Sequence, residues 1–186
     1  YIMKKNVLLT VAVVVLSIGV IVGGFFGYKA LSKKGLPDKT LPEIQNKVDY
    51  KDFTVTDKNG NSARLSDFIG RPIVINFWAS WCPPCKAELP HFDKLAKEYA
   101  GKVEFLMVNL SGENKDTVLS FVNKNGYSFP LYFDDFNSGA NAYSVSQIPV
   151  TVFITAKGNI GARRVGAMSE ITLRSYVTQL LSDESR

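Results

Sequence analysis

Two cysteines, Cys82 and Cys85, are the residues of this sequence best suited to catalysis, and the chain has no others. Pro83 and Pro84 separate them. As a structural cross-link the pair would contribute only about 2 kcal/mol, because a disulfide that closes so short a loop removes little chain entropy. A pair with this spacing is better suited to cycling between a dithiol and a disulfide. We therefore predict that the two residues catalyse thiol-disulfide exchange.

The roles of the two sulfurs follow from their expected place at the start of a helix. A near-continuous apolar run predicts a buried strand over 72–79, and apolar spacings of three and four predict a helix over 84–99. With Cys82 as the N-cap, the N–H of Cys85 points at its sulfur and the helix dipole stabilises a thiolate there. Cys82 is the predicted nucleophile and Cys85 the predicted resolving thiol.

Neither a metal site nor a haem site fits these residues. A Cys/His zinc site needs about four ligands, and Cys82, Cys85 and His91 supply three at most. A c-type haem site needs a histidine directly after the second cysteine, where this sequence has Lys86. We expect no metal and no cofactor, with the cysteine pair itself as the redox-active group.

Two further positions each allow two interpretations. Glu88 follows Cys85 by three residues on the same helix face, where a partly buried carboxylate could exchange a proton with the thiol. The alternative is an ordinary helical glutamate stabilised by the dipole. Pro149, in the run Gln147-Ile148-Pro149-Val150, either forms a cis bond that leaves the Ile148 backbone free for an extended substrate, or is trans and opens a strand.

Predicted strands and helices alternate over the rest of the chain. Strands are expected over 53–57, 62–68, 72–79, 103–110, 130–134, 150–155 and 160–166, and helices over 84–99, 115–125, 138–143 and 169–182. The first two strands flank an Asn59-Gly60 turn, and the last two form a second hairpin. The pattern predicts an α/β fold with a central mixed sheet, helices on both faces and an N-terminal β-hairpin.

The N-terminal part differs in character from this domain. Residues 6–28 carry no charge and would form a helix of about 35 Å, enough to cross a bilayer. A cleaved signal peptide is the alternative, but the apolar run exceeds the usual length of such a segment. We predict a transmembrane anchor with juxtamembrane lysines over 1–35, a linker over 36–49, and one domain over 50–186. Lysines flank the apolar run on both sides, so their count does not set its orientation.

The net charge of +5 does not indicate a nucleic-acid partner. Five of the 22 basic residues and none of the 17 acidic ones lie in residues 1–35. The remainder of the chain is therefore neutral, and we expect no nucleic-acid binding.

The motifs together resemble the thioredoxin superfamily: a WCPPC turn before a helix, Pro90 within that helix, and Ile148-Pro149 at a strand entry. The runs NFWASWCPPCKAELP and FTVTDKNGNSARLSDFIGRPIVI resemble the membrane-anchored, extracytoplasmic TlpA/ResA-like thiol-disulfide oxidoreductases. The resemblance covers about residues 50–182 and implies a thioredoxin-like fold.

Roles for particular residues also follow from the resemblance. It implies Cys82 as nucleophile, Cys85 as resolving thiol, Pro149 as a cis-proline and Glu88 as a proton acceptor near the thiols. Apart from the resemblance, we predict that Trp81, as an aromatic at the rim of the site, binds substrate together with Ile148 and Pro149. Plain thioredoxins carry a buried aspartate where this chain has Asn76.

The same resemblance implies a single-pass protein of the cell membrane with its C-terminal domain outside the cytoplasm. Its expected partners are exported proteins, such as apocytochrome c or envelope enzymes, whose disulfides it reduces, and a membrane redox partner that supplies electrons. A disulfide-forming oxidase would use the same two sulfurs in the opposite direction. A peroxidase would need one cysteine in a different turn, and a redox-inert surface interaction domain would need neither cysteine.

Overall fold

The computed structural model describes residues 49–110 and 112–183. Every described residue belongs to one compact unit, Lys47–Arg186. The predicted anchor and nearly all of the predicted linker lie outside the described residues. Among the residues that are described, no helix is long and apolar enough to cross a bilayer.

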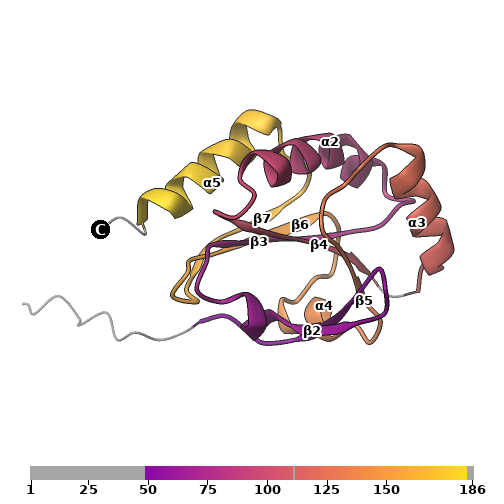
Figure 1. Ribbon diagram of the computed structural model, residues 1–186, viewed down its shortest axis with the longest axis horizontal. Coiled ribbons are helices and arrows are strands. Elements are labelled where there is room, and N and C mark those ends of the chain that lie inside the picture. Colours follow the sequence, from indigo (N-terminus) through magenta and orange to yellow (C-terminus); the bar gives the residue numbers. More distant parts are fainter. Residues whose placement is uncertain (1–48, 111, 184–186) are drawn as a thin grey trace, which may run out of the picture. The chain divides into compact units, whose positions relative to one another are not determined.

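The domain consists of one sheet with helices on both of its faces (Figure 1). The strands are β1 (Thr54–Asp57), β2 (Ser62–Arg64), β3 (Ile73–Trp78), β4 (Glu104–Leu110), β5 (Leu131–Asp134), β6 (Val150–Ile154) and β7 (Ile160–Val165). The helices are η1 (Leu65–Phe68, a 3-10 helix), α2 (Pro83–Glu98), α3 (Lys115–Lys124), α4 (Ser138–Ala142) and α5 (Glu170–Asp183).

The sheet is mixed, with the strand order β2-β1-β5-β4-β3-β6-β7. Helical crossovers make β3, β4 and β5 parallel, whereas β1 and β6 pair antiparallel with β5 and β3. Two hairpins, β1–β2 and β6–β7, complete the two ends. The predicted α/β fold with a mixed sheet is confirmed.

The sheet divides the core in two, and the side chains of its inner strand β3 alternate between the two faces. Val74 and Trp78 pack on the side that holds α2 and α5, and Ile75 and Phe77 pack on the side that holds α4. Asn76 lies midway between Val74 and Trp78 along the strand, two residues from each, so its side chain points to the same face of the sheet. A polar side chain therefore enters the apolar layer beneath α2.

The predicted strand over 62–68 is partly wrong. β2 ends at Arg64, and Leu65–Phe68 form the 3-10 helix η1. The Asp67 carboxylate accepts a hydrogen bond from the N–H of Arg64 at 2.8 Å, which closes a helical turn. Leu65 is buried on the α4 side of the sheet, so the chain leaves the hairpin to fill the core.

The strand β7 forms one edge of the sheet and carries two consecutive arginines. The guanidinium of Arg163 donates to the carbonyl oxygen of Ser144 at 3.3 Å, on the α4 side. Arg164 lies over the ring of Tyr176 in α5, 6.0 Å from its centroid. The pairing of β6 with β7 also shifts register between Phe153 and Ile154.

Candidate active site

The turn that joins β3 to α2 holds both cysteines at the start of the helix. The N–H of Cys82 donates to the carbonyl oxygen of Ala79 at 3.3 Å, which closes the turn. Cys82 is the N-cap of α2, and its sulfur accepts a hydrogen bond from the N–H of Cys85 at 3.3 Å. Pro83 and Pro84 occupy the first two helical positions, where no intrahelical donor is needed. A thiolate at Cys82 is stabilised by that hydrogen bond and by the helix dipole.

The two cysteines are joined in a disulfide, with an S–S distance of 2.16 Å and a Cα–Cα distance of 5.3 Å. The structure is therefore that of the oxidised form. Cys85 is fully buried, and Cys82 is 3% exposed. Only Cys82 of the two lines the groove described next, so an incoming sulfur reaches Cys82 first.

A groove of about 460 Å³ opens over the disulfide. Its nine lining residues are all uncharged: Trp81, Cys82, Pro83, Pro84, Leu110, Val145, Ser146, Gln147 and Ile148. We call this the active-site groove. Trp81 is 67% exposed and forms one wall. An apolar groove with two polar side chains suits a peptide segment of low charge.

The opposite wall of the active-site groove comes from the segment before β6. The carbonyl oxygen of Ile148 lies 3.9 Å from the sulfur of Cys82. The peptide bond between Ile148 and Pro149 is cis, one of the two geometries that the sequence allows and the one that the resemblance implies. The structure thus brings Trp81, Cys82 and Ile148 to one groove. Pro149 follows Ile148 in the chain and does not itself line the groove.

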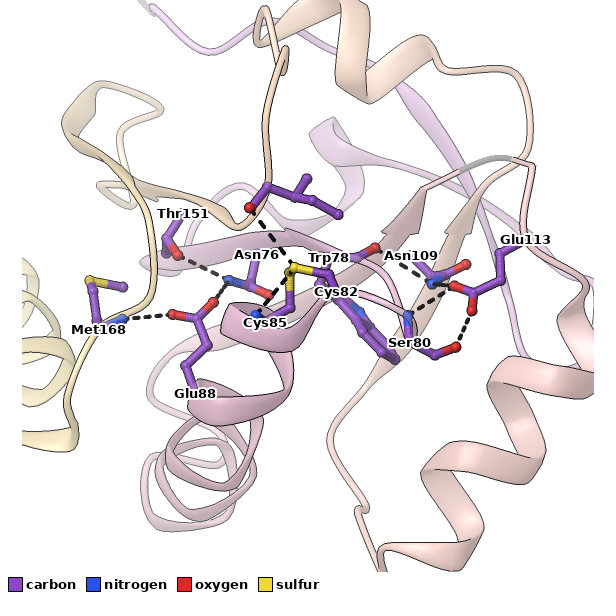
Figure 2. The surroundings of a disulfide bond; sticks show 11 residues. Asn76, Trp78, Ser80, Cys82, Cys85, Glu88, Asn109, Glu113, Thr151 and Met168 are labelled. Atoms are coloured by element: carbon purple, nitrogen blue, oxygen red, sulfur yellow. Dashed lines mark hydrogen bonds between the residues drawn. A yellow bond between two sulfur atoms is a disulfide. The ribbon is translucent and has the colours of Figure 1, made fainter.

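Glu88 lies on the sheet-facing side of α2 and is buried (Figure 2). Its carboxylate accepts one hydrogen bond from the amide of Asn76 at 2.8 Å and one from the N–H of Met168 at 2.9 Å. Burial raises the pKa of Glu88 to about 7, although both hydrogen bonds favour the charged form. The Asn76 amide also donates to the hydroxyl of Thr151 at 3.0 Å. A carboxyl group with this pKa can accept or release a proton near neutral pH.

Several residues around the site were not predicted from the sequence. Leu110 and Val145 line the active-site groove although they lie far along the chain from the cysteines. Met168 contributes a backbone N–H, which no sequence pattern marks. Glu113 contacts the turn before Cys82, as described below. Among the described residues, no three histidine, cysteine or acidic side chains are grouped to hold a metal ion.

Comparison with known proteins agrees with this geometry. The sequence profile of the AhpC/TSA family matches residues 47–163. The chain is 35% identical over 130 residues to the thiol-disulfide oxidoreductase ResA of Geobacillus kaustophilus, which is 69% of this chain and 74% of that one. It is 30% identical over 184 residues to the ResA of Bacillus thuringiensis, or 96% of this chain and 99% of that one. The crystal structure of StoA from Bacillus subtilis superposes with a TM-score of 0.61 at 27% identity, covering 70% of this chain and 98% of that one.

Proposed function

Because the chain belongs to the AhpC/TSA family and is a thioredoxin-like thiol-disulfide oxidoreductase of the ResA type, we propose that it reduces disulfides of exported proteins. The observation that carries the proposal is the placement of the Cys82 sulfur. It caps α2 at the floor of an uncharged groove, next to the carbonyl of Ile148. A disulfide in an unfolded or extended segment fits such a groove.

The reduction proceeds by two exchanges of sulfur partners. In the reduced enzyme the Cys82 thiolate attacks one sulfur of the client disulfide, which forms a mixed disulfide and releases the other client sulfur as a thiolate that takes a proton. The Cys85 thiol passes its proton to the Glu88 carboxylate and attacks the Cys82 sulfur. The second client sulfur leaves as a thiolate that takes a proton from solvent, and Glu88 returns its proton to solvent. The enzyme keeps the Cys82–Cys85 disulfide. Two electrons have then passed from the enzyme to the client.

Each cycle leaves the enzyme oxidised, so it requires a dithiol donor. We assign this role to a membrane redox partner, with the enzyme held at the outer face of the cell membrane by residues 6–28. The uncharged length of that segment supports the assignment. Apocytochrome c and envelope enzymes, as exported proteins with cysteine pairs, are the proposed clients.

The reduction potential of the Cys82–Cys85 pair tests the direction of the reaction. The full chain in detergent is equilibrated with thiol-disulfide buffers of graded potential, and the fraction of free thiols is measured by alkylation. We expect a value at or below about −220 mV, in the range of thioredoxin and the glutaredoxins. A value near −120 mV, typical of a strong oxidant, would instead support the disulfide-forming oxidase.

A further inference from the structure

Glu113 lies between β4 and α3 and contacts the turn that carries the nucleophilic cysteine (Figure 2). One carboxylate oxygen accepts hydrogen bonds from the N–H of Ser80 at 3.0 Å and from the Asn109 amide at 2.9 Å. The other accepts a hydrogen bond from the hydroxyl of Ser80. A single half-buried side chain thus binds both the backbone and the side chain of Ser80.

Asn109 connects this carboxylate to the sheet. It is the residue opposite Trp78 in the parallel pair of β3 and β4, and it is 1% exposed. Its amide lies 3.5 Å from the carbonyl oxygen of Trp78 and donates to Glu113. The orientation of the Glu113 carboxylate is therefore fixed by a buried residue of the central sheet.

Ser80, the residue that Glu113 binds, lies inside the turn that leads to Cys82. The hydrogen bond from Cys82 to Ala79 makes Ser80 and Trp81 the two central residues of that turn. Trp81 is 67% exposed, so packing holds its indole only weakly. The anchor at Ser80 is the nearest fixed point before Trp81 and Cys82.

We infer that Glu113 is a positioning residue for the exchange reaction: it holds the Ser80–Trp81 turn so that the Trp81 wall and the Cys82 sulfur keep their places in the active-site groove. The inference rests on the proposed function, because it takes the groove to be where a client disulfide meets Cys82. It assigns Glu113 no contact with the reacting sulfurs. Displacements of about 1 Å in such a support can cost large factors in rate.

Two substitutions separate this role from an effect of charge. Glu113→Ala removes all three hydrogen bonds. In Glu113→Gln the amide oxygen can accept from the Ser80 N–H and from Asn109, while the amide nitrogen donates to the Ser80 hydroxyl oxygen, which can also accept. We expect kcat/KM for reduction of insulin, used as the probe disulfide, to fall about tenfold in Glu113→Ala and to return to within about twofold of wild type in Glu113→Gln.

A spectroscopic measurement checks the position of the turn without relying on turnover. Of the two tryptophans, Trp78 is fully buried and Trp81 is exposed, so acrylamide quenching reports mainly on Trp81. In Glu113→Ala we expect the fluorescence anisotropy of the quenchable component to fall, and in Glu113→Gln to remain at the wild-type value. Asp116→Ala is the matched control, because it removes an exposed carboxylate from the second residue of α3. It should change neither kcat/KM nor the anisotropy.

Three outcomes would overturn the inference. Glu113→Ala with wild-type kinetics and anisotropy would show that the turn needs no support from Glu113. Equal losses in Glu113→Ala and Glu113→Gln would show that the charge matters rather than the hydrogen bonds. A loss of kcat/KM that follows the loss of unfolding free energy, with unchanged anisotropy, would show a merely structural role. If wild type fails to reduce insulin and its reduction potential is that of a strong oxidant, the proposed function fails, while the anisotropy of Trp81 still tests the inference.

Discussion

Cys82→Ser is expected to abolish thiol-disulfide exchange, lowering the rate on the order of a thousandfold or more, because the substitution removes the nucleophile that the groove presents. Serine is itself a favourable N-cap and can accept the same hydrogen bond from Cys85, so α2 should begin at the same residue. Loss of the short disulfide should cost only about 2 kcal/mol of folding stability. Reduction of insulin by a dithiol donor, measured beside a thermal unfolding curve, checks this result.

Cys85→Ser provides the matched comparison, because it retains the nucleophile and removes the resolving thiol. The first exchange still takes place, and the mixed disulfide between Cys82 and the client then accumulates. We expect a covalent adduct on non-reducing gels that disappears on treatment with excess dithiol. Exchange that survives in Cys82→Ser, or the absence of any adduct in Cys85→Ser with a reducible client, would contradict the assigned roles.

Glu88→Gln is expected to change how the stability of the oxidised protein depends on pH. The pKa of Glu88 is about 7 in the folded protein and about 4.5 in the unfolded chain. Between these values the unfolded chain has lost the proton that the folded protein keeps, so the free energy of unfolding falls as the pH rises from about 4.5 to about 7. Glu88 therefore contributes about 3 kcal/mol less to the free energy of unfolding above this pH range than below it, because each unit of pKa difference corresponds to about 1.4 kcal/mol. The glutamine variant lacks this contribution.

The measurement is the difference in unfolding free energy between Glu88→Gln and wild type, taken from denaturant curves at pH 4.5 and pH 8. Relative to wild type, the unfolding free energy of the variant should be about 3 kcal/mol higher at pH 8 than at pH 4.5. Asp116→Asn, at an exposed carboxylate, should show no comparable change. A difference that is independent of pH would mean that Glu88 ionises in the folded protein as it does in the unfolded chain.

The same variant should also alter the pH profile of exchange. Without the carboxylate, the Cys85 thiol must lose its proton to solvent, so the resolving step should slow by about ten- to a hundredfold at pH 7 and recover at alkaline pH. A profile identical to that of wild type would leave Glu88 with a structural role only.

Local patterns in the sequence predicted most of the fold and the central part of the site. The buried strand β3 shows as an apolar run, and α2 shows as helical spacing after two prolines. The placement of Cys82 as N-cap needs only the order strand, turn and helix, so the sequence is sufficient to predict it. The exception was the second arm of the first hairpin, where buried Leu65 and the Asp67 capping bond turn a predicted strand into a helical turn.

The parts of the site that were not predicted depend on contacts between distant segments. Glu113 is 33 residues from Ser80, and its sequence neighbours form no recognisable pattern. The burial of Glu88 requires α2 to lie over Asn76 and the segment before α5 to supply the N–H of Met168. Sequence periodicity gives the face of a residue within its own element. It does not give the partner that the assembled sheet brings to that face.

The two edge strands of the sheet affect whether copies of the domain associate with one another at high concentration. An unprotected strand edge offers free backbone groups to another chain and can start aggregation. Here β2 presents only the short edge Ser62–Arg64. At the other end, β7 places Arg163 toward one face and Arg164 toward the other. Two copies that paired through β7 with these residues opposite one another would bring like charges together. A short edge at one end and a charged edge at the other thus both disfavour edge-to-edge association of the domain at high local concentration.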